Sequence, residues 1–199
     1  MQRMPLVLLL IGTLPGLVGC NAGEADLDDA TRARVVALGD SAAMSLVRRL
    51  GGELNRQLAT DGPAGAVQFC AGEAQALTDS VSDALGAGWA VKRTTLRARN
   101  PRNAPDSLES AALRYFHEAD AAGQEREHWV QRTAAGDFRY YMPLRVAPMC
   151  LECHGERDRI DPAVRQVLET RYPTDEATGY REGDLRGVVR VTVPAEAAS

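Results

Sequence analysis

The 199-residue sequence has no block rich in lysine or arginine. Its arginines are scattered among aspartate and glutamate residues, and the formal net charge at pH 7 is −4. Proteins that bind nucleic acids or anionic membrane surfaces usually gather basic residues on one face. The sequence therefore predicts no nucleic-acid partner.

Internal repeats and low-complexity tracts are also missing, and the apolar run at residues 5–18 is short for a transmembrane helix, which needs about 20 residues. With 45% hydrophobic and 25% charged residues, the composition is that of a globular protein. The length suits a single domain with a hydrophobic core.

The N-terminal apolar run is typical of a secretory signal. It ends in Leu17-Val18-Gly19-Cys20, which resembles a bacterial lipobox, where the cysteine receives diacylglycerol before cleavage in front of it. We predict a lipoprotein signal peptide at residues 1–19 and a lipid anchor at Cys20. An ordinary signal peptide or a retained single-pass anchor are the alternatives.

This prediction places the protein in the cell envelope, on the periplasmic side and attached to a membrane through Cys20. Asn21 stands where some Gram-negative lipoproteins carry the aspartate that retains them at the inner membrane. The sequence is therefore compatible with a location at the outer membrane.

The four cysteines could form two disulfides in an oxidising compartment. However, the lipobox takes Cys20, and Cys150-Leu151-Glu152-Cys153-His154 has the Cys-x-x-Cys-His spacing of haem c attachment. In that motif two thiols add to the haem vinyl groups and the histidine lies beneath the iron as an axial ligand. One motif predicts one covalent haem.

A zinc site and a thioredoxin-like redox pair are the alternatives for this motif. Zinc takes four ligands, and His154, adjacent to Cys153, is hard to aim at the same ion. A thioredoxin-like pair belongs near a βαβ unit, which the sequence pattern does not indicate. Haem attachment is therefore favoured.

The first half of the chain predicts helices. An acidic linker at residues 20–30 precedes residues 35–58, where apolar side chains recur every three or four positions, as in a long amphipathic helix. Residues 61–65 break the pattern, and a second helix is expected over 66–85. Cys70 shares its apolar face with Ala74, Leu77, Val81 and Ala84 and should point inward.

The rest of the chain predicts strands and shorter helices. Residues 89–99 read as a strand whose alternation changes phase, which suggests a bulge, and residues 107–122 as a helix. Residues 128–133 and 138–146 form a hairpin in which Pro143 indicates an edge or a bulge. A short helix starts at Asp161 and Pro162 and ends before Pro173, and residues 185–193 form a last strand. We expect an α+β domain with an antiparallel sheet over residues 31–195.

From about Leu50 onward the chain resembles a family of single-haem c-type domains with a PAS-like fold, which occur alone or as extracytoplasmic sensor regions of bacterial signalling proteins. The residues that carry the resemblance are Phe69-Cys70, Arg99-Asn100-Pro101, Asn103-Ala104-Pro105-Asp106, Tyr141-Met142-Pro143-Leu144, Cys150-Leu151-Glu152-Cys153-His154-Gly155, Tyr172-Pro173-Thr174-Asp175, Thr178-Gly179-Tyr180 and Gly183-Asp184-Leu185-Arg186-Gly187. The resemblance implies a central sheet of about five antiparallel strands, a long N-terminal helix and flanking helices. It also implies that His154 and Cys70 are the two axial ligands.

The residues alone leave several candidates for the ligand opposite His154. They are Cys70, Met44, Met142, Met149, His117 and His128. Cys70 is favoured because it faces inward, is unpaired and matches the family. A thiolate ligand would stabilise Fe(III) and lower the reduction potential. For the anionic haem propionates, Arg97, Arg99, Arg139 and Tyr141 are the candidate contacts.

These features favour an envelope haem protein that transfers single electrons. The alternative is a redox or small-molecule sensor; the chain carries no recognisable output domain, so such a sensor would act through a protein partner. An enzyme is less favoured, because no acid–base constellation accompanies His117 or His128.

Overall fold

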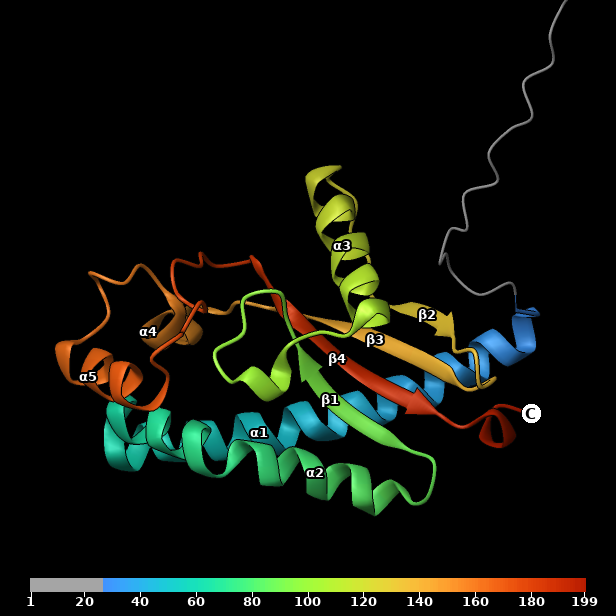
Figure 1. Ribbon diagram of the computed structural model, residues 1–199, viewed down its shortest axis with the longest axis horizontal. Coiled ribbons are helices and arrows are strands. Elements are labelled where there is room, and N and C mark those ends of the chain that lie inside the picture. Colours follow the sequence, from blue (N-terminus) through green and yellow to red (C-terminus); the bar gives the residue numbers. More distant parts are fainter. Residues whose placement is uncertain (1–26) are drawn as a thin grey trace, which may run out of the picture.

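The computed structural model describes residues 27–199, so the predicted signal peptide, Cys20 and most of the predicted linker lie outside the described residues (Figure 1). The helices are α1 (Asp29–Gly72), α2 (Ala74–Leu85), α3 (Ser107–Ala121), α4 (Leu151–His154) and α5 (Pro162–Arg171), with short 3-10 turns η1 (Pro101–Asn103), η2 (Pro148–Cys150) and η3 (Ala195–Ala197). Within these residues, no helix combines the length and apolar character needed to cross a membrane.

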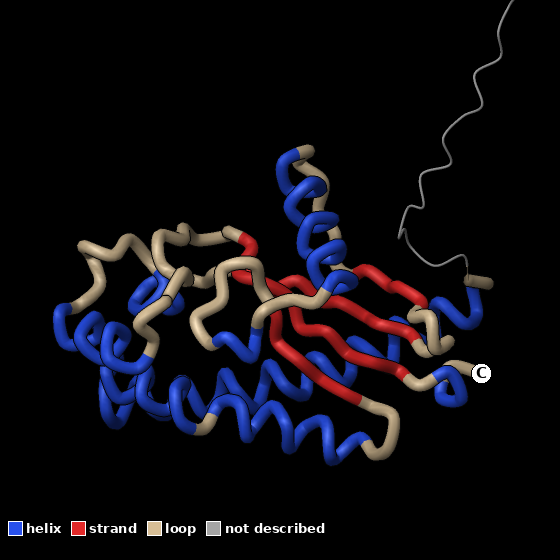
Figure 2. Tube along the Cα trace, viewed as in Figure 1, coloured by secondary structure: helices blue, strands red, loops and turns tan. Residues whose placement is uncertain are grey.

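An antiparallel sheet forms the centre of the molecule. Its strands are β1 (Ala90–Thr94), β2 (Trp129–Arg132), β3 (Phe138–Arg145) and β4 (Leu185–Val193), in the order β1-β4-β3-β2. Figure 2 shows α1 and α2 along one side of this sheet, α3 standing on the other, and α4 and α5 beyond one end. The expected α+β fold is confirmed, but the described part of the chain has four strands in this sheet, whereas the resemblance implied about five.

Apolar side chains alternate between the two faces of the sheet along β3 and β4, and each face has its own hydrophobic core. Tyr140, Val189 and Val191 pack with α1 residues such as Leu46 in the larger core. Tyr141 and Val188 point the other way and pack with Leu113 and Phe116 of α3 in a second core. Successive strand residues face opposite sides of a sheet, so both faces of β3 and β4 are covered.

The predicted break at residues 61–65 is a bend within α1. Gly62 has a φ of 68°, a region that glycine enters without steric penalty, and Pro63 follows it. The helix resumes and ends at Gly72, where Glu73 separates it from α2. The predicted second helix is therefore two pieces: Cys70 belongs to the last turns of α1, and Ala84 is exposed and not on the inner face.

The strand predicted over residues 89–99 is longer than the observed strand β1, which ends at Thr94. Only Ala90–Thr94 pairs with β4, and the change of phase marks the point where the chain leaves the sheet. Thr95 Oγ1 there donates to the Arg186 carbonyl at 2.8 Å, so Arg97 and Arg99 stand on a loop. Pro143 lies beyond the last β2–β3 pair, Trp129 with Tyr141, where β3 is locally an edge, as its missing N–H requires.

The contact of α1 with the sheet depends on Gly39. A Cβ atom at this position would overlap the ring of Tyr140. Gly39→Ala should lower the free energy of unfolding by about 1–3 kcal/mol, the usual effect of overfilling a core. Gly52, on the same helix, is exposed and has no atom within 4 Å of such a Cβ, so Gly52→Ala should raise stability by about 0.5–1 kcal/mol. Urea titrations of the two variants should give opposite shifts.

Candidate functional site

A cavity of about 290 Å³ lies between α1, α4 and the end of the sheet. One wall is apolar and comes from α1 and the two central strands: Leu46, Val47, Leu50, Leu54, Leu58, Val67, Leu144 and Val189. Cys70 lines the cavity from α1, and Cys150, Cys153 and His154 line it from η2 and α4. The fold thus brings together the four residues that the sequence assigned to the cofactor and its ligands.

The three cysteines are free thiols spread around this cavity. Within residues 27–199, no three histidine, cysteine or acidic side chains lie close enough to hold one metal ion between them. A structural zinc site needs four converging ligands, so this arrangement suits a larger ligand placed between the side chains. Burial raises the pKa of Cys70 and raises that of Cys153 to about 11, which keeps both thiols protonated.

His154 is oriented by the backbone of a distant segment. Its Nδ1 donates a hydrogen bond to the Ala177 carbonyl at 2.7 Å. Burial, together with the nearby Arg99 and Arg186 guanidinium groups, lowers the pKa of His154 well below its usual range. The ring is therefore neutral with the proton on Nδ1, and Nε2 keeps its lone pair. Histidines that bind metal ions are usually held by such a bond at the other ring nitrogen.

Arg99 holds helix α4, which carries His154, against residues 175–177. Its side chain is 9% exposed, and its Nε lies 3.1 Å from Asp175 Oδ2 in a buried ion pair. Its Nη2 donates to the carbonyls of Cys153 at 2.6 Å and Ala177 at 3.2 Å. Arg99 lines the cavity as the sequence suggested, but these contacts make it the link between α4 and residues 175–177.

Three further arginines, which the sequence analysis missed, line the cavity: Arg145, which pairs with Asp120, and Arg93 and Arg186, which have no carboxylate partner in the described chain. Arg186 Nη1 donates only to uncharged acceptors, Thr95 Oγ1 at 3.2 Å and the Arg97 carbonyl at 3.3 Å. Arg93 Nη2 donates to the Ala74 carbonyl at 3.3 Å. Burial lowers the pKa of both arginines. The position of Arg93, two residues after the buried Val91 on β1, was a signal for it, because both side chains share one face of the strand.

The cavity is electropositive. Among its described lining residues there are four arginines and no carboxylate, and only Arg99 and Arg145 form ion pairs with acidic side chains. A buried cation is unfavourable unless a negative group compensates it. The site therefore suits a ligand with an apolar body and anionic groups.

The structure does not bring Tyr141 and Arg97 to this cavity. Tyr141 is fully buried on the α3 side of the sheet, where its hydroxyl donates to Gln131 Oε1 at 2.8 Å. Arg97 donates to the carbonyls of Glu176 and Thr178, and its guanidinium lies 4.3 Å from the centre of the Tyr180 ring. Arg139 pairs instead with Asp106. Of the six candidates for the ligand opposite His154, only Cys70 and Met149 line the cavity.

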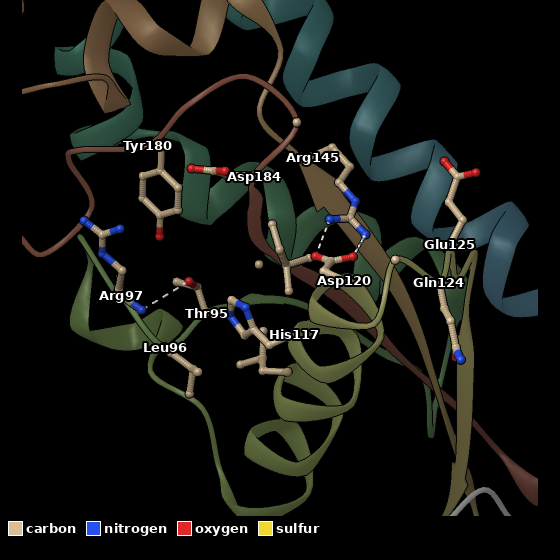
Figure 3. A pocket seen from close by; sticks show the side chains of 15 residues that line it. Thr95, Leu96, Arg97, His117, Asp120, Gln124, Glu125, Arg145, Tyr180 and Asp184 are labelled. Atoms are coloured by element: carbon tan, nitrogen blue, oxygen red, sulfur yellow. Dashed lines mark hydrogen bonds and ion pairs between the residues drawn. The ribbon is translucent and has the colours of Figure 1, made fainter.

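A second, larger cleft of about 870 Å³ opens on the α3 side of the sheet. Figure 3 shows Asp120 paired with Arg145 in this cleft, His117 on α3, and Arg97 beside Tyr180 on the opposite wall. The Tyr180 ring also meets the His154 ring edge-on, with centroids 6.2 Å apart. Tyr180 therefore touches both the second cleft and a residue of the cavity.

A family model named Tll0287-like matches residues 24–194 of the chain. The chain belongs to the Tll0287-like family. This match confirms the family resemblance found in the sequence and covers every residue of the cavity. The crystal structure of the cyanobacterial heme-protein Tll0287 is 25% identical in sequence, with a TM-score of 0.50 over 76% of this chain and 94% of that one. No match was found among curated proteins.

Arg99 should be essential for the stability of this Tll0287-like site. Arg99→Met leaves Asp175 buried without its partner, which should lower the free energy of unfolding by about 3–5 kcal/mol. The matched control is Arg102→Gln, whose ion pair with Asp79 is exposed, and its effect should stay below about 1 kcal/mol. Equal effects of the two substitutions in denaturant titrations would contradict this role.

Proposed function

We propose that this protein binds one covalent haem c in the cavity and transfers single electrons in the cell envelope. The observation that carries the proposal is that Cys70, Cys150, Cys153 and His154 line one apolar, electropositive cavity. The relative of known structure is described as a heme-protein, which supports haem as the ligand.

The residues of the cavity fit this group. The leucine-rich wall suits the apolar macrocycle, and Arg186, which lacks a carboxylate partner in the described chain, suits an anionic propionate. The cavity, at about 290 Å³, lies at the lower end of the range of about 300–1,000 Å³ that is usual for small-molecule sites. It continues to the surface at Met149, which is 38% exposed. Haem c would supply a one-electron iron couple.

The chain's own side chains would do the rest. Cys150 and Cys153 would attach the group as thioethers, and His154 Nε2 and the Cys70 sulfur would be the axial ligands. Burial raises the pKa of the free Cys70 thiol, and iron binding would displace the thiol proton, so Cys70 would bind as a thiolate. An anionic sulfur favours the oxidised state and a low potential. With both axial positions filled by side chains, electron transfer is favoured over oxygen chemistry.

Sensing is the second candidate function, and the larger cleft favours it. A small molecule bound there could contact Tyr180, whose ring touches His154. Such a sensor would need a signalling protein as its partner. Displacement of Cys70 by CO or NO would favour sensing, whereas fast reversible redox cycling without a spectral response to these gases would favour electron transfer.

Covalent attachment can be tested in a host that matures c-type haem. The wild-type protein should give the pyridine haemochrome spectrum of haem c at one haem per chain, because it has one Cys-x-x-Cys-His motif. Cys150→Ser with Cys153→Ser should lose the covalent haem. A wild-type protein without covalent haem would rule out the proposal.

The role of Cys70 is tested separately. Cys70→Ala should keep the covalent haem, because the thioether cysteines remain, but should change the absorption spectrum and raise the midpoint potential through loss of the anionic ligand. Met149→Leu is the matched control, since Met149 also lines the cavity. A wild-type spectrum from Cys70→Ala would remove Cys70 from the iron.

We also propose that the lipid anchor at Cys20 holds the protein to the membrane from the periplasmic side. Several acyl chains give stable membrane attachment. Cys20→Ser should therefore move the protein from the membrane fraction to the soluble fraction and abolish labelling with a radioactive fatty acid. Haem content should be unchanged, because Cys20 is outside the attachment motif.

A further inference from the structure

Arg93 is an arginine on the inner face of the sheet. It is paired across strands with Val189, and both residues line the cavity. Its Nη2 donates to the Ala74 carbonyl at 3.3 Å, at the start of α2 and just beyond the end of α1 that carries Cys70. The guanidinium is thus held beside the Cys70 segment.

The charge of Arg93 has no close counter-ion. Its Nε is buried without a hydrogen-bond partner in the described chain, and no ion pair joins it to a carboxylate there. The acidic groups near enough to act on it are Asp79, Tyr172 and Cys70, but Asp79 already binds Gln75 and Arg102. A half-buried guanidinium whose Nε is enclosed without a partner calls for a negative group in the cavity.

Three arginines follow one another along the cavity from the Cys70 end to the His154 end. Arg93 binds the Ala74 carbonyl, four residues beyond Cys70, and Arg99 binds the Cys153 carbonyl. The Arg186 guanidinium, in contrast, lies 5.3 Å from the centre of the Tyr180 ring, which meets the His154 ring edge-on. Arg93 therefore belongs to the Cys70 end of the cavity, Arg186 to the His154 end, and Arg99 lies between them.

We propose that Arg93 is the counter-cation of the Cys70 sulfur and keeps Cys70 bound in both oxidation states. This inference rests on the proposed haem function. Reduction adds one negative charge at the site, which favours release of the sulfur. In release, the iron–sulfur bond breaks, its electron pair stays on sulfur, and sulfur takes a proton from water. The guanidinium opposes release because it stabilises the negative charge that the bound sulfur keeps and that is lost when the sulfur leaves as a neutral thiol, so Arg93 is a positioning residue.

The test is CO binding to the reduced holoprotein, followed by absorption. Wild type should bind CO poorly, because Cys70 occupies the position that CO needs. Arg93→Gln should bind it at least tenfold more tightly, with a reduced spectrum that shows loss of the sulfur ligand. Arg93→Lys should restore wild-type behaviour by returning the charge, and Arg157→Gln, at an exposed ion pair with Glu169, should have no effect.

Three results would overturn the inference. They are a reduced Arg93→Gln protein that has full haem content and ignores CO, tight CO binding by the reduced wild type, and an Arg93→Gln protein with less covalent haem whose loaded fraction responds to CO as wild type does. The last would assign Arg93 to a propionate. If Arg93→Gln does not fold, the same measurement on Arg93→Met decides. Pyridine haemochrome on wild type separates these results from a failure of the haem proposal itself.

Discussion

The carbonyl of Ala177 is the point on which the site depends. It accepts hydrogen bonds from Arg99 Nη2 and from His154 Nδ1, and so joins a buried ion pair to the orientation of the imidazole. Arg99 in turn binds Asp175 and the Cys153 carbonyl. Backbone bonds from Gly179 to Gly155 and from Tyr180 to His154 add to this junction. One segment, residues 175–180, therefore decides where His154 points.

Acidic side chains of the described chain do not balance all the positive charges that line the cavity. Arg93 and Arg186 are half-buried there without carboxylate partners in the described chain, and loss of contact with water lowers the pKa of each. Elsewhere in the molecule a buried charge is fully compensated: Glu109, 1% exposed, pairs with Lys92 and Arg190. The contrast indicates that the cavity arginines are placed for a ligand, which would supply the missing negative charge.

The two faces of the sheet carry different cores and different hollows. The α1 face carries the larger core and the cavity, while the α3 face carries a smaller core and the open cleft. Tyr180 and Arg145 connect the two sides: Tyr180 meets His154, and Arg145 lines both hollows. This connection is the structural basis for considering a sensing role beside electron transfer.

The sequence by itself determined most of the helices, the hairpin, the last strand and the Cys-x-x-Cys-His spacing, because each depends on local periodicity, turn residues or the spacing of neighbours. Residues 150–154 needed no tertiary structure to be recognised. Local signals failed where a long-range contact decides: the loop position of Arg97, the burial of Tyr141 under α3, and the roles of Arg93 and Arg186. Only the tertiary structure could bring Cys70 to the motif, because that distance depends on the bend at Gly62 and on the packing of α1 against the sheet.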